Sequence, residues 1–359
     1  MKILLVKYRN IGDVLLSTPL LANFRHHYPE ARIDFALNDY CVEMIADHPD
    51  IGKVFPYPRK FLRSMSFHRR IRGEIAYLRR VLKNGYDVVV NLTEGDRGHL
   101  IAALSRATYR LGLPARQGIF KWLNPCTALA SETDHVHTVA KCFQYLDLLG
   151  LDTVTRKVSI YWSKVVDRRI DELLDTHGIE RFAHVHPVSR WMFKCWEDDR
   201  MARIIDFLER EANIRVVISA SSEKKERDRV DKVLSFCRST PLNLTGQLTL
   251  KELACLASRA RFFFGIDSAP MHMAAAVDTP VVALFGGSSP VLWGPWDNEL
   301  ANPAYRLADG IQHVGKHSVV VRTDQTIFYE GEIKKSRGMT SISEEEVRRV
   351  VSEKVAQWG

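Results

Sequence analysis

The chain has 359 residues, of which 46% are hydrophobic and 26% charged, and 51 basic against 43 acidic residues give a formal net charge of +8. This length predicts two domains of ordinary size. The apolar content excludes general disorder, because the chain can bury enough surface to offset its ordering entropy. A membrane-spanning helix is excluded as well, since runs such as Val281–Phe285 are far shorter than the roughly 20 apolar residues that a bilayer core requires.

The N-terminus is typical of a first strand rather than of a signal peptide. Its apolar run is interrupted by Lys7 and Arg9, and no small-residue cleavage site follows. The six cysteines are scattered without a Cys-x-x-Cys pair, which favours reduced thiols over a disulfide framework or a structural zinc site. We therefore expect a cytoplasmic protein.

Short β-branched runs alternate with helical patterns in both halves of the chain. The expected strands are 3–6, 33–36, 53–55, 87–91 and 109–113, then 182–186, 215–219, 262–264 and 281–285. The expected helices are 14–27, 59–83, 99–106 and 136–149, then 197–210, 224–236, 250–258 and 270–276. This alternation predicts an α/β protein of two doubly wound, Rossmann-like domains, each with its ligand site at the carboxyl ends of parallel strands.

The pattern of linkers sets the expected domain boundaries. Residues 151–163 read as a connecting strand and linker, which places a first domain at 1–163 and a second at 164–341. The last segment, 342–359, contains an amphipathic helix over 343–358, introduced by Ser343 and three glutamates.

The positive charge is concentrated in residues 59–83, where nine basic residues stand against the single acid Glu74. Such a run is either a solvated helix face or a platform for an anionic partner such as a phospholipid surface, a phosphorylated glycan or a nucleic acid. Apolar residues at helical spacing predict an amphipathic helix with one buried face. They are Phe61, Met65, Phe67, Ile71, Ile75, Tyr77, Leu78 and Leu82.

The first candidate site follows the first strand. Gly12 permits a tight strand-to-helix turn, and Asp13 falls at the start of the next helix. Asp13 is either an ordinary helix cap or, at a strand end that points to the ligand site, a base that accepts a proton from a hydroxyl. No Gly-x-Gly-x-x-Gly is present, which argues against a dinucleotide cofactor.

The second candidate site lies at the end of the strand 262–264. Ser268 can cap the following helix, and the small Ser268 and Ala269 leave its first N–H groups open to a phosphate; His272 is one helical turn further on. Alternatively, this is only a well-formed helix start. Gly286, at the next strand end, opens a loop expected to enlarge the same pocket.

Two further strand ends carry polar residues. Ser189, Arg190 and Lys194 follow the strand 182–186, where a cation can neutralise a diphosphate, and Glu223 follows 215–219, where a carboxylate can bind ribose hydroxyls. The alternative is that the charges are solvated while the aromatic neighbours pack. Taken together, the candidate sites suit group transfer from a nucleotide-activated donor.

These motifs resemble those of the ADP-heptose:lipopolysaccharide heptosyltransferases, a glycosyltransferase family of the GT-B fold. The resemblance spans 7–19, 194–196 and 265–290, and the segments 91–93, 193–196 and 267–270 are most similar to the branch that adds a side-branch heptose to the second heptose of the inner core. Arg9 and Asn10 depart from members that have two small hydroxyl residues there.

The resemblance implies a role for each matching residue. Asp13 matches the catalytic base, Lys194 the residue that holds the donor phosphates, Glu223 the ribose-binding acid and Asp267 the acid that contacts the donor heptose. The backbone amides of Ser268 and Ala269 match the diphosphate site. The family inverts the anomeric carbon without a bound metal or cofactor, and its terminal helix crosses back onto the first domain, so that the two domains face each other across a cleft.

We group Ser189, His272 and Gly286 with the donor-binding residues. The expected partners are ADP-heptose, a lipid-linked inner-core acceptor and, peripherally, the cytoplasmic face of the inner membrane, without nucleic acid. The expected acceptor-binding residues are Asn10, Arg63, Arg69, Arg72, Asp96 and Arg97. Two alternatives remain: another GT-B nucleotide-sugar enzyme such as an epimerase, and a non-enzymatic binder of an anionic surface.

Overall fold

The computed structural model describes residues 1–115, 118–131 and 135–357, and it divides into two compact units, Met1–Tyr161 and Trp162–Gly359. The division follows Tyr161, against the expected boundary at 163. Residues 151–163 contain no regular helix or strand, so the linker is present without the expected connecting strand.

The first unit is built on a parallel sheet with strand order β3-β2-β1-β4-β5-β6. The apolar runs form the centre of this sheet, where Ile3 to Val6 of β1 and Val89 and Val90 of β4 are fully buried. The strands are β1 (Lys2–Lys7), β2 (Arg32–Asn38), β3 (Val54–Tyr57), β4 (Val88–Asn91), β5 (Tyr109–Gly112) and β6 (Ala128–Leu129).

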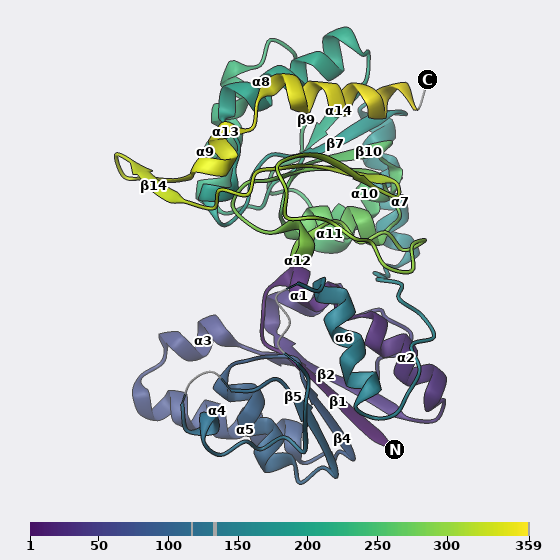
Figure 1. Cartoon of the computed structure of the whole chain (residues 1–359), viewed down its shortest axis with the longest axis vertical. Helices are drawn as coiled ribbons and strands as arrows, with labels where there is room; N and C mark the ends of the chain where they lie inside the picture. Colours follow the sequence, from purple (N-terminus) through teal and green to yellow (C-terminus); the bar gives the residue numbers. More distant parts are fainter. Residues whose placement is uncertain (116–117, 132–134, 358–359) are drawn as a thin grey trace. The chain divides into compact units, whose positions relative to one another are not determined.

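Helices cover both faces of this sheet, with α2 and α6 on one side and α4 and α5 on the other (Figure 1). The single helix expected over 14–27 is divided, because Pro19 cannot continue a helix and instead begins the second one. The helices are α1 (Ile11–Leu15), α2 (Pro19–His27), α3 (Arg59–Ser64), α4 (Phe67–Leu82), α5 (Asp96–Ser105) and α6 (Thr138–Asp147), with short 3-10 turns η1 (Asp39–Met44) and η2 (Ile119–Lys121).

The second unit repeats this plan. Its sheet has the order β12-β13-β11-β10-β7-β8-β9, parallel except for the antiparallel edge pair β12/β13. Numbered from β7 within the unit, the parallel strands have the same 3-2-1-4-5-6 order as the first sheet. They are β7 (Phe182–His186), β8 (Arg215–Ile218), β9 (Leu242–Asn243), β10 (Phe262–Ile266), β11 (Val281–Phe285), β12 (Gly310–Val314) and β13 (His317–Val321).

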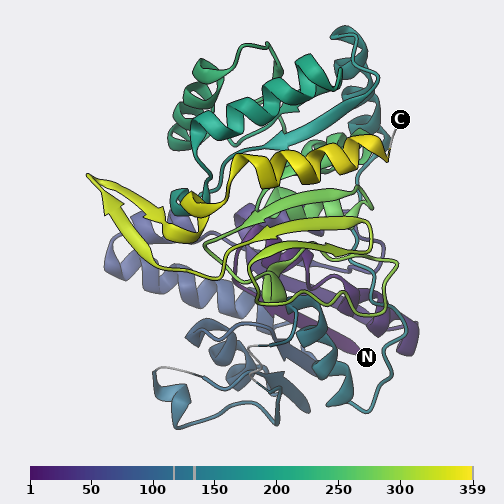
Figure 2. The same ribbon diagram turned by 45° about the horizontal axis from the view of Figure 1, so that its top comes forward.

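The helices of the second unit also cover both faces of its sheet, α8, α9 and α14 on one side and α7, α10 and α11 on the other (Figures 1 and 2). The first group packs on the sheet through a core that includes Trp196, Ile204 and Val350. The helices are α7 (Lys164–Thr176), α8 (Asp198–Asp206) with a π-helical extension (Phe207–Glu211), α9 (Lys224–Phe236), α10 (Leu250–Arg259), α11 (Ala269–Ala276), α12 (Pro290–Trp293), α13 (Arg337–Ser341) and α14 (Glu344–Ala356), with the 3-10 turn η3 (Met192–Lys194).

The terminal helix α14 packs within the second unit. It contacts α8 and β13, and Val347, Val350 and Val351 are fully buried in the core of that unit, whereas its expected packing on the first domain stays a prediction. These valines form the apolar face of α14, and its burial in this core explains where the helix packs. Ser343 caps the helix as predicted; the expected last helical residue, Trp358, lies outside the described residues.

An antiparallel hairpin of β14 (Ile327–Glu330) and β15 (Ile333–Ser336) extends from the second unit (Figure 2). Sequence patterning did not predict it. Along the described parts of the chain, every helix is too short or too polar to cross a bilayer.

Candidate active site

Both sheets have one point where the strand order reverses, and four of the expected site residues follow the strands that flank these points. In the first unit this point lies between β1 and β4, and in the second between β7 and β10. Loops that leave the carboxyl ends of such a strand pair in opposite directions open a crevice that binds ligands in doubly wound folds. Asp13 and Asp96 follow β1 and β4, and Lys194 and Asp267 follow β7 and β10.

Lys194 and Asp267 meet at the reversal point of the second sheet. The Lys194 ammonium lies 2.5 Å from Asp267 Oδ2, and the side chains are 19% and 6% exposed. The Ser288 hydroxyl donates to the same oxygen at 2.5 Å, and His272 Nε2 lies 3.9 Å from Oδ1. Asp267 is therefore a buried anion with a cation beside it, and Lys194 keeps a partly exposed head that can meet a phosphate.

The segment that carries Lys194 is held from two directions. Its backbone N–H donates to Trp191 O at 2.8 Å within η3, and the buried Trp196 donates from Nε1 to Ile342 O at 3.1 Å. A Cβ at Gly287 would lie 3.3 Å from the Phe193 ring and 3.4 Å from Lys194 Cγ. A side chain at Gly287 would therefore crowd the Phe193 ring and the lysine stem.

Helix α11 begins at this point and offers its first N–H groups. Ser268 occupies the N-cap position with an extended backbone, but its hydroxyl does not cap the helix. This corrects the expected capping role. The Ser268 Oγ is buried and has no hydrogen-bond partner among the residues described by the structure. A buried hydroxyl and a helix N-terminus beside Lys194 form an anion-binding arrangement.

The remaining expected donor residues differ in their surroundings. Ser189 is 8% exposed, and its hydroxyl accepts the Trp191 N–H at 3.2 Å, while Glu223 is exposed at the N-cap of α9. Gly286 corrects the expectation of an open loop: a Cβ there would lie 2.4 Å from Met339 N, so this glycine serves close packing against α13. Its neighbour Ser288, which sequence reasoning had not assigned, is the residue of that loop that reaches Asp267.

Asp13 occupies a defined place in the first unit. Asn10, and not Asp13, is the N-cap of α1, and Asp13 Oδ2 accepts the Asn10 N–H at 3.2 Å as the third helical residue. The preceding loop is fixed by Tyr8 N–H donating to Thr93 Oγ1 at 3.0 Å and by Asn38 Nδ2 donating to Arg9 O at 2.9 Å. The half-buried carboxylate is therefore rigidly placed.

Arg97 makes several contacts within the first unit. Its guanidinium lies 3.7 Å from the centre of the Tyr57 ring and 3.0 Å from Glu74 Oε1. Tyr57 also donates to Glu74 at 2.5 Å, and burial together with that bond raises the Tyr57 pKa to about 12. Arg97 also lines a small cavity together with Asp96, which begins α5, so the acceptor role of both residues stays a prediction.

The three expected acceptor arginines Arg63, Arg69 and Arg72 are exposed on α3 and α4, and Asn10 is exposed in the loop after β1.

Sequence reasoning missed a buried polar cluster in the second unit. The Ser219 hydroxyl lies 2.7 Å from His184 Nε2 and 2.9 Å from His186 Nδ1. Two histidines alternating in an apolar strand were the available signal.

Comparisons with known proteins place the chain in a family. The model of glycosyltransferase family 9 (heptosyltransferase) matches residues 75–307, well over half of the sequence. The chain belongs to this family. It is 29% identical over 300 residues to lipopolysaccharide heptosyltransferase 3 of Escherichia coli strain K12, covering 80% of this chain and 83% of that protein.

Solved structures agree on the fold. A family 9 glycosyltransferase from Veillonella parvula matches with a TM-score of 0.80 at 21% identity, covering 99% of this chain and 97% of that one. ADP-heptose lipopolysaccharide heptosyltransferase II of E. coli matches with 0.74 at 18% identity, covering 100% and 99%. The expected α/β class and GT-B fold are confirmed. Family membership makes the protein a glycosyltransferase, in preference to the epimerase and to the non-enzymatic binder.

Proposed function

We propose that this glycosyltransferase moves heptose from ADP-heptose to a heptose of the lipopolysaccharide inner core. The observation that carries the proposal is the cluster of the buried Asp267 with the half-buried Lys194 and Ser288, beside the N-terminus of α11. A cation and helix amides suit a diphosphate, and a buried carboxylate suits the hydroxyls of a sugar.

In the proposed reaction the acceptor hydroxyl oxygen forms a bond to the anomeric carbon of the donor heptose. The bond from that carbon to the ADP oxygen breaks, its electron pair leaves with ADP, and the hydroxyl proton passes to Asp13. One displacement inverts the anomeric configuration. Lys194 and the amides of Ser268 and Ala269 stabilise the growing negative charge on ADP, a task for which no resident metal is proposed.

The remaining donor and acceptor residues keep the roles that we proposed from sequence. Glu223 is proposed to bind the ribose, with Ser189, His272 and Gly286 around the donor. Acceptor contacts are proposed for Asn10, Arg63, Arg69, Arg72, Asp96 and Arg97. The enzyme would act at the cytoplasmic face of the inner membrane, where a lipid-linked acceptor is anchored.

The finer proposal is that the transferred sugar is the third heptose, added to the second. It is supported by the likeness to lipopolysaccharide heptosyltransferase 3. The test uses ADP-heptose with cores that end in one or in two heptoses, and mass spectrometry of the products. Extension of the two-heptose core alone is the expected result. Extension of the one-heptose core instead would overturn the assignment of the acceptor.

A further inference from the structure

The helices α3 and α4 expose large apolar side chains that we expected to be buried. On α4, Phe67, Ile71 and Ile75 are 71%, 42% and 43% exposed, and on α3 Phe61 is 61% exposed. The three residues of α4 are spaced four apart, so they form one row along the helix surface. The expected single buried face is therefore wrong for half of its members.

The geometry of α4 explains why this row stays in solvent. Tyr77 and Val81 point into the core under the helix, and Leu62 of α3 fills the space over Gly73, where a Cβ would lie 2.4 Å from Leu62 Cδ2. At about 100° per residue, Phe67, Ile71 and Ile75 lie roughly a quarter turn from this buried face.

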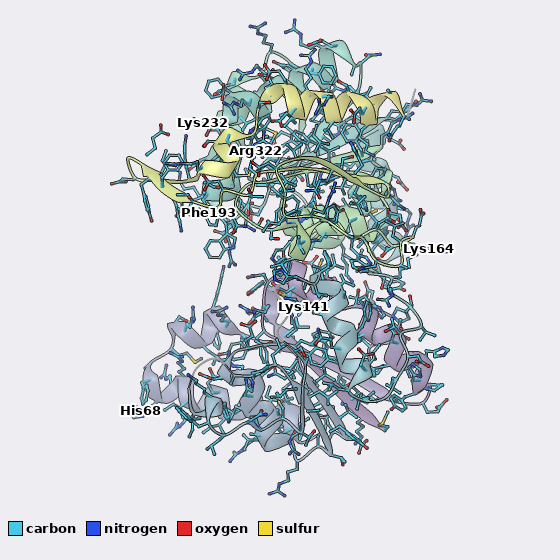
Figure 3. The ribbon with its side chains drawn as sticks, in the orientation of Figure 1. His68, Lys141, Lys164, Phe193, Lys232 and Arg322 are labelled. Atoms are coloured by element: carbon cyan, nitrogen blue, oxygen red, sulfur yellow. The ribbon has the colours of Figure 1, made fainter. Side chains whose placement is uncertain are left out.

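The exposed row is flanked by cations. Eight basic residues of the segment 59–83 have exposed side chains, and the single acid, Glu74, is turned inward to Arg97 and Tyr57. His68, labelled in Figure 3, is a further exposed residue in the first turn of α4. The exposed basic residues are Lys60, Arg63, Arg69, Arg70, Arg72, Arg79 and Arg80, with Lys83 just beyond the helix.

We propose that this surface docks on an anionic lipid bilayer, with Phe61, Phe67, Ile71 and Ile75 inserted at the boundary between headgroups and acyl chains. Arginine side chains beside such a row reach the lipid phosphates while their stems cover apolar surface. A soluble protein partner would need a surface that is both strongly acidic and apolar, whereas an anionic bilayer offers these two properties in successive layers. The inference deepens the proposed function, because a lipid-linked acceptor lies in the same layer.

The apolar row distinguishes this mode from electrostatic attraction alone. Salt screens the attraction between exposed charges, which is largely lost beyond a Debye length of roughly 8 Å at physiological salt. Apolar insertion into the bilayer is not weakened by salt. If electrostatic attraction and apolar insertion both contribute, part of the vesicle binding should therefore persist at high salt.

The test measures co-flotation of the full chain with phosphatidylcholine vesicles, with and without phosphatidylglycerol, at low and high salt. We compare wild type with the variant Phe61→Ser, Phe67→Ser, Ile71→Ser, Ile75→Ser, and with Arg69→Gln, Arg70→Gln, Arg72→Gln. A matched control replaces exposed apolar residues of the second unit, Val165→Ser, Phe236→Ser and Leu307→Ser, which are 64%, 50% and 59% exposed.

Wild type and control are expected to bind phosphatidylglycerol vesicles. The apolar variant should lose tenfold or more of that binding and all of its salt-resistant part, while the arginine variant should lose mainly the salt-sensitive part. Equal flotation of the apolar variant and wild type would overturn the proposal. So would a concentration-dependent dimer of wild type that the apolar variant abolishes, because the row would then be a self-association surface.

A second measurement separates this inference from the proposed function. Turnover on a delipidated, water-soluble core acceptor should be equal in wild type and the apolar variant. If wild type turns over that acceptor but binds no vesicles, the docking proposal alone fails. If wild type binds vesicles but transfers no heptose, the proposed function alone fails.

Discussion

At the residue scale, Asp13 combines a structural bond with a proposed chemical task. Its Oδ2 accepts the Asn10 N–H at 3.2 Å, so Asp13→Ala would also disturb the start of α1. Asp13→Asn keeps an oxygen for that bond but cannot accept a proton. We expect turnover to fall by roughly 10²- to 10⁴-fold, with the ADP-heptose Kd and the thermal midpoint near wild type. Kinetics and donor titration check this, and near wild-type turnover would eliminate Asp13 as the base.

The Lys194–Asp267 pair allows a sharper test than a single substitution. Lys194→Ala leaves the carboxylate of Asp267, 6% exposed, without its cation, which should cost about 3–5 kcal/mol of stability. Lys194→Ala with Asp267→Asn should regain most of that stability. Both variants should bind ADP-heptose weakly and turn over slowly, because the phosphate-facing cation is gone. Thermal unfolding and donor titration give the two readouts; normal donor affinity in either variant would contradict the role of Lys194.

At the element scale, the β14–β15 hairpin braces the segment that carries Lys194. Lys334 Nζ lies 4.9 Å from the centre of the Phe193 ring, and Lys335 Nζ lies 3.3 Å from Glu197, so the hairpin contacts residues on both sides of the lysine. Figure 3 shows Phe193 at the foot of the hairpin.

We expect Lys335→Met to raise the Michaelis constant for ADP-heptose several-fold with little change in kcat, and Lys335→Arg to restore it. Lys225→Met, at an exposed lysine of α9, is the control. The measurement is steady-state kinetics with the donor varied. An unchanged donor constant in Lys335→Met would show that the hairpin has no positioning role.

The strand β7 gives the second unit a pH dependence. Burial lowers the pKa of His184 and of His186 to about 3, below the value near 6.5 of an unfolded chain. Both remain neutral in the fold, so the unfolded chain binds more protons between these values, and stability is present above pH 6.5 and lost as the pH falls toward 3.

Between pH 7 and pH 5 each histidine should remove about 2 kcal/mol of unfolding free energy. His186→Gln should flatten this slope by one such contribution. The check is thermal unfolding of both proteins at several pH values. Parallel profiles of stability against pH for the variant and wild type would contradict a neutral, buried His186 in the fold.

At the scale of the whole molecule, the repeated strand order explains where functional residues occur in the sequence. Each unit presents the loops after its first and fourth strands at one point, so residues far apart in sequence, such as Lys194 and Asp267, become neighbours. The polar residues that follow these strands could be recognised in the sequence. The fold class and the positions of most central strands could therefore be predicted from apolar runs alone.

Other features depend on tertiary packing, which the hydrophobic pattern of the sequence does not reveal. The two-residue strands β6 and β9 and the polar hairpin β14–β15 leave too weak a periodic signal. Helix α14 is amphipathic, but its sequence does not say which unit supplies the partner face. Likewise Arg97 and Gly286 are polar or small residues at strand ends, and only their neighbours Tyr57 and Met339 reveal packing roles.

The central claim is tested most directly by incubating the purified chain with ADP-heptose and a heptose-bearing inner core, and following the glycan by mass spectrometry together with ADP release. We predict that each core gains one heptose and that one ADP appears per heptose transferred, with the new bond inverted relative to the donor. Consumption of ADP-heptose without any glycan of increased mass, or an unchanged donor and acceptor, would contradict the account.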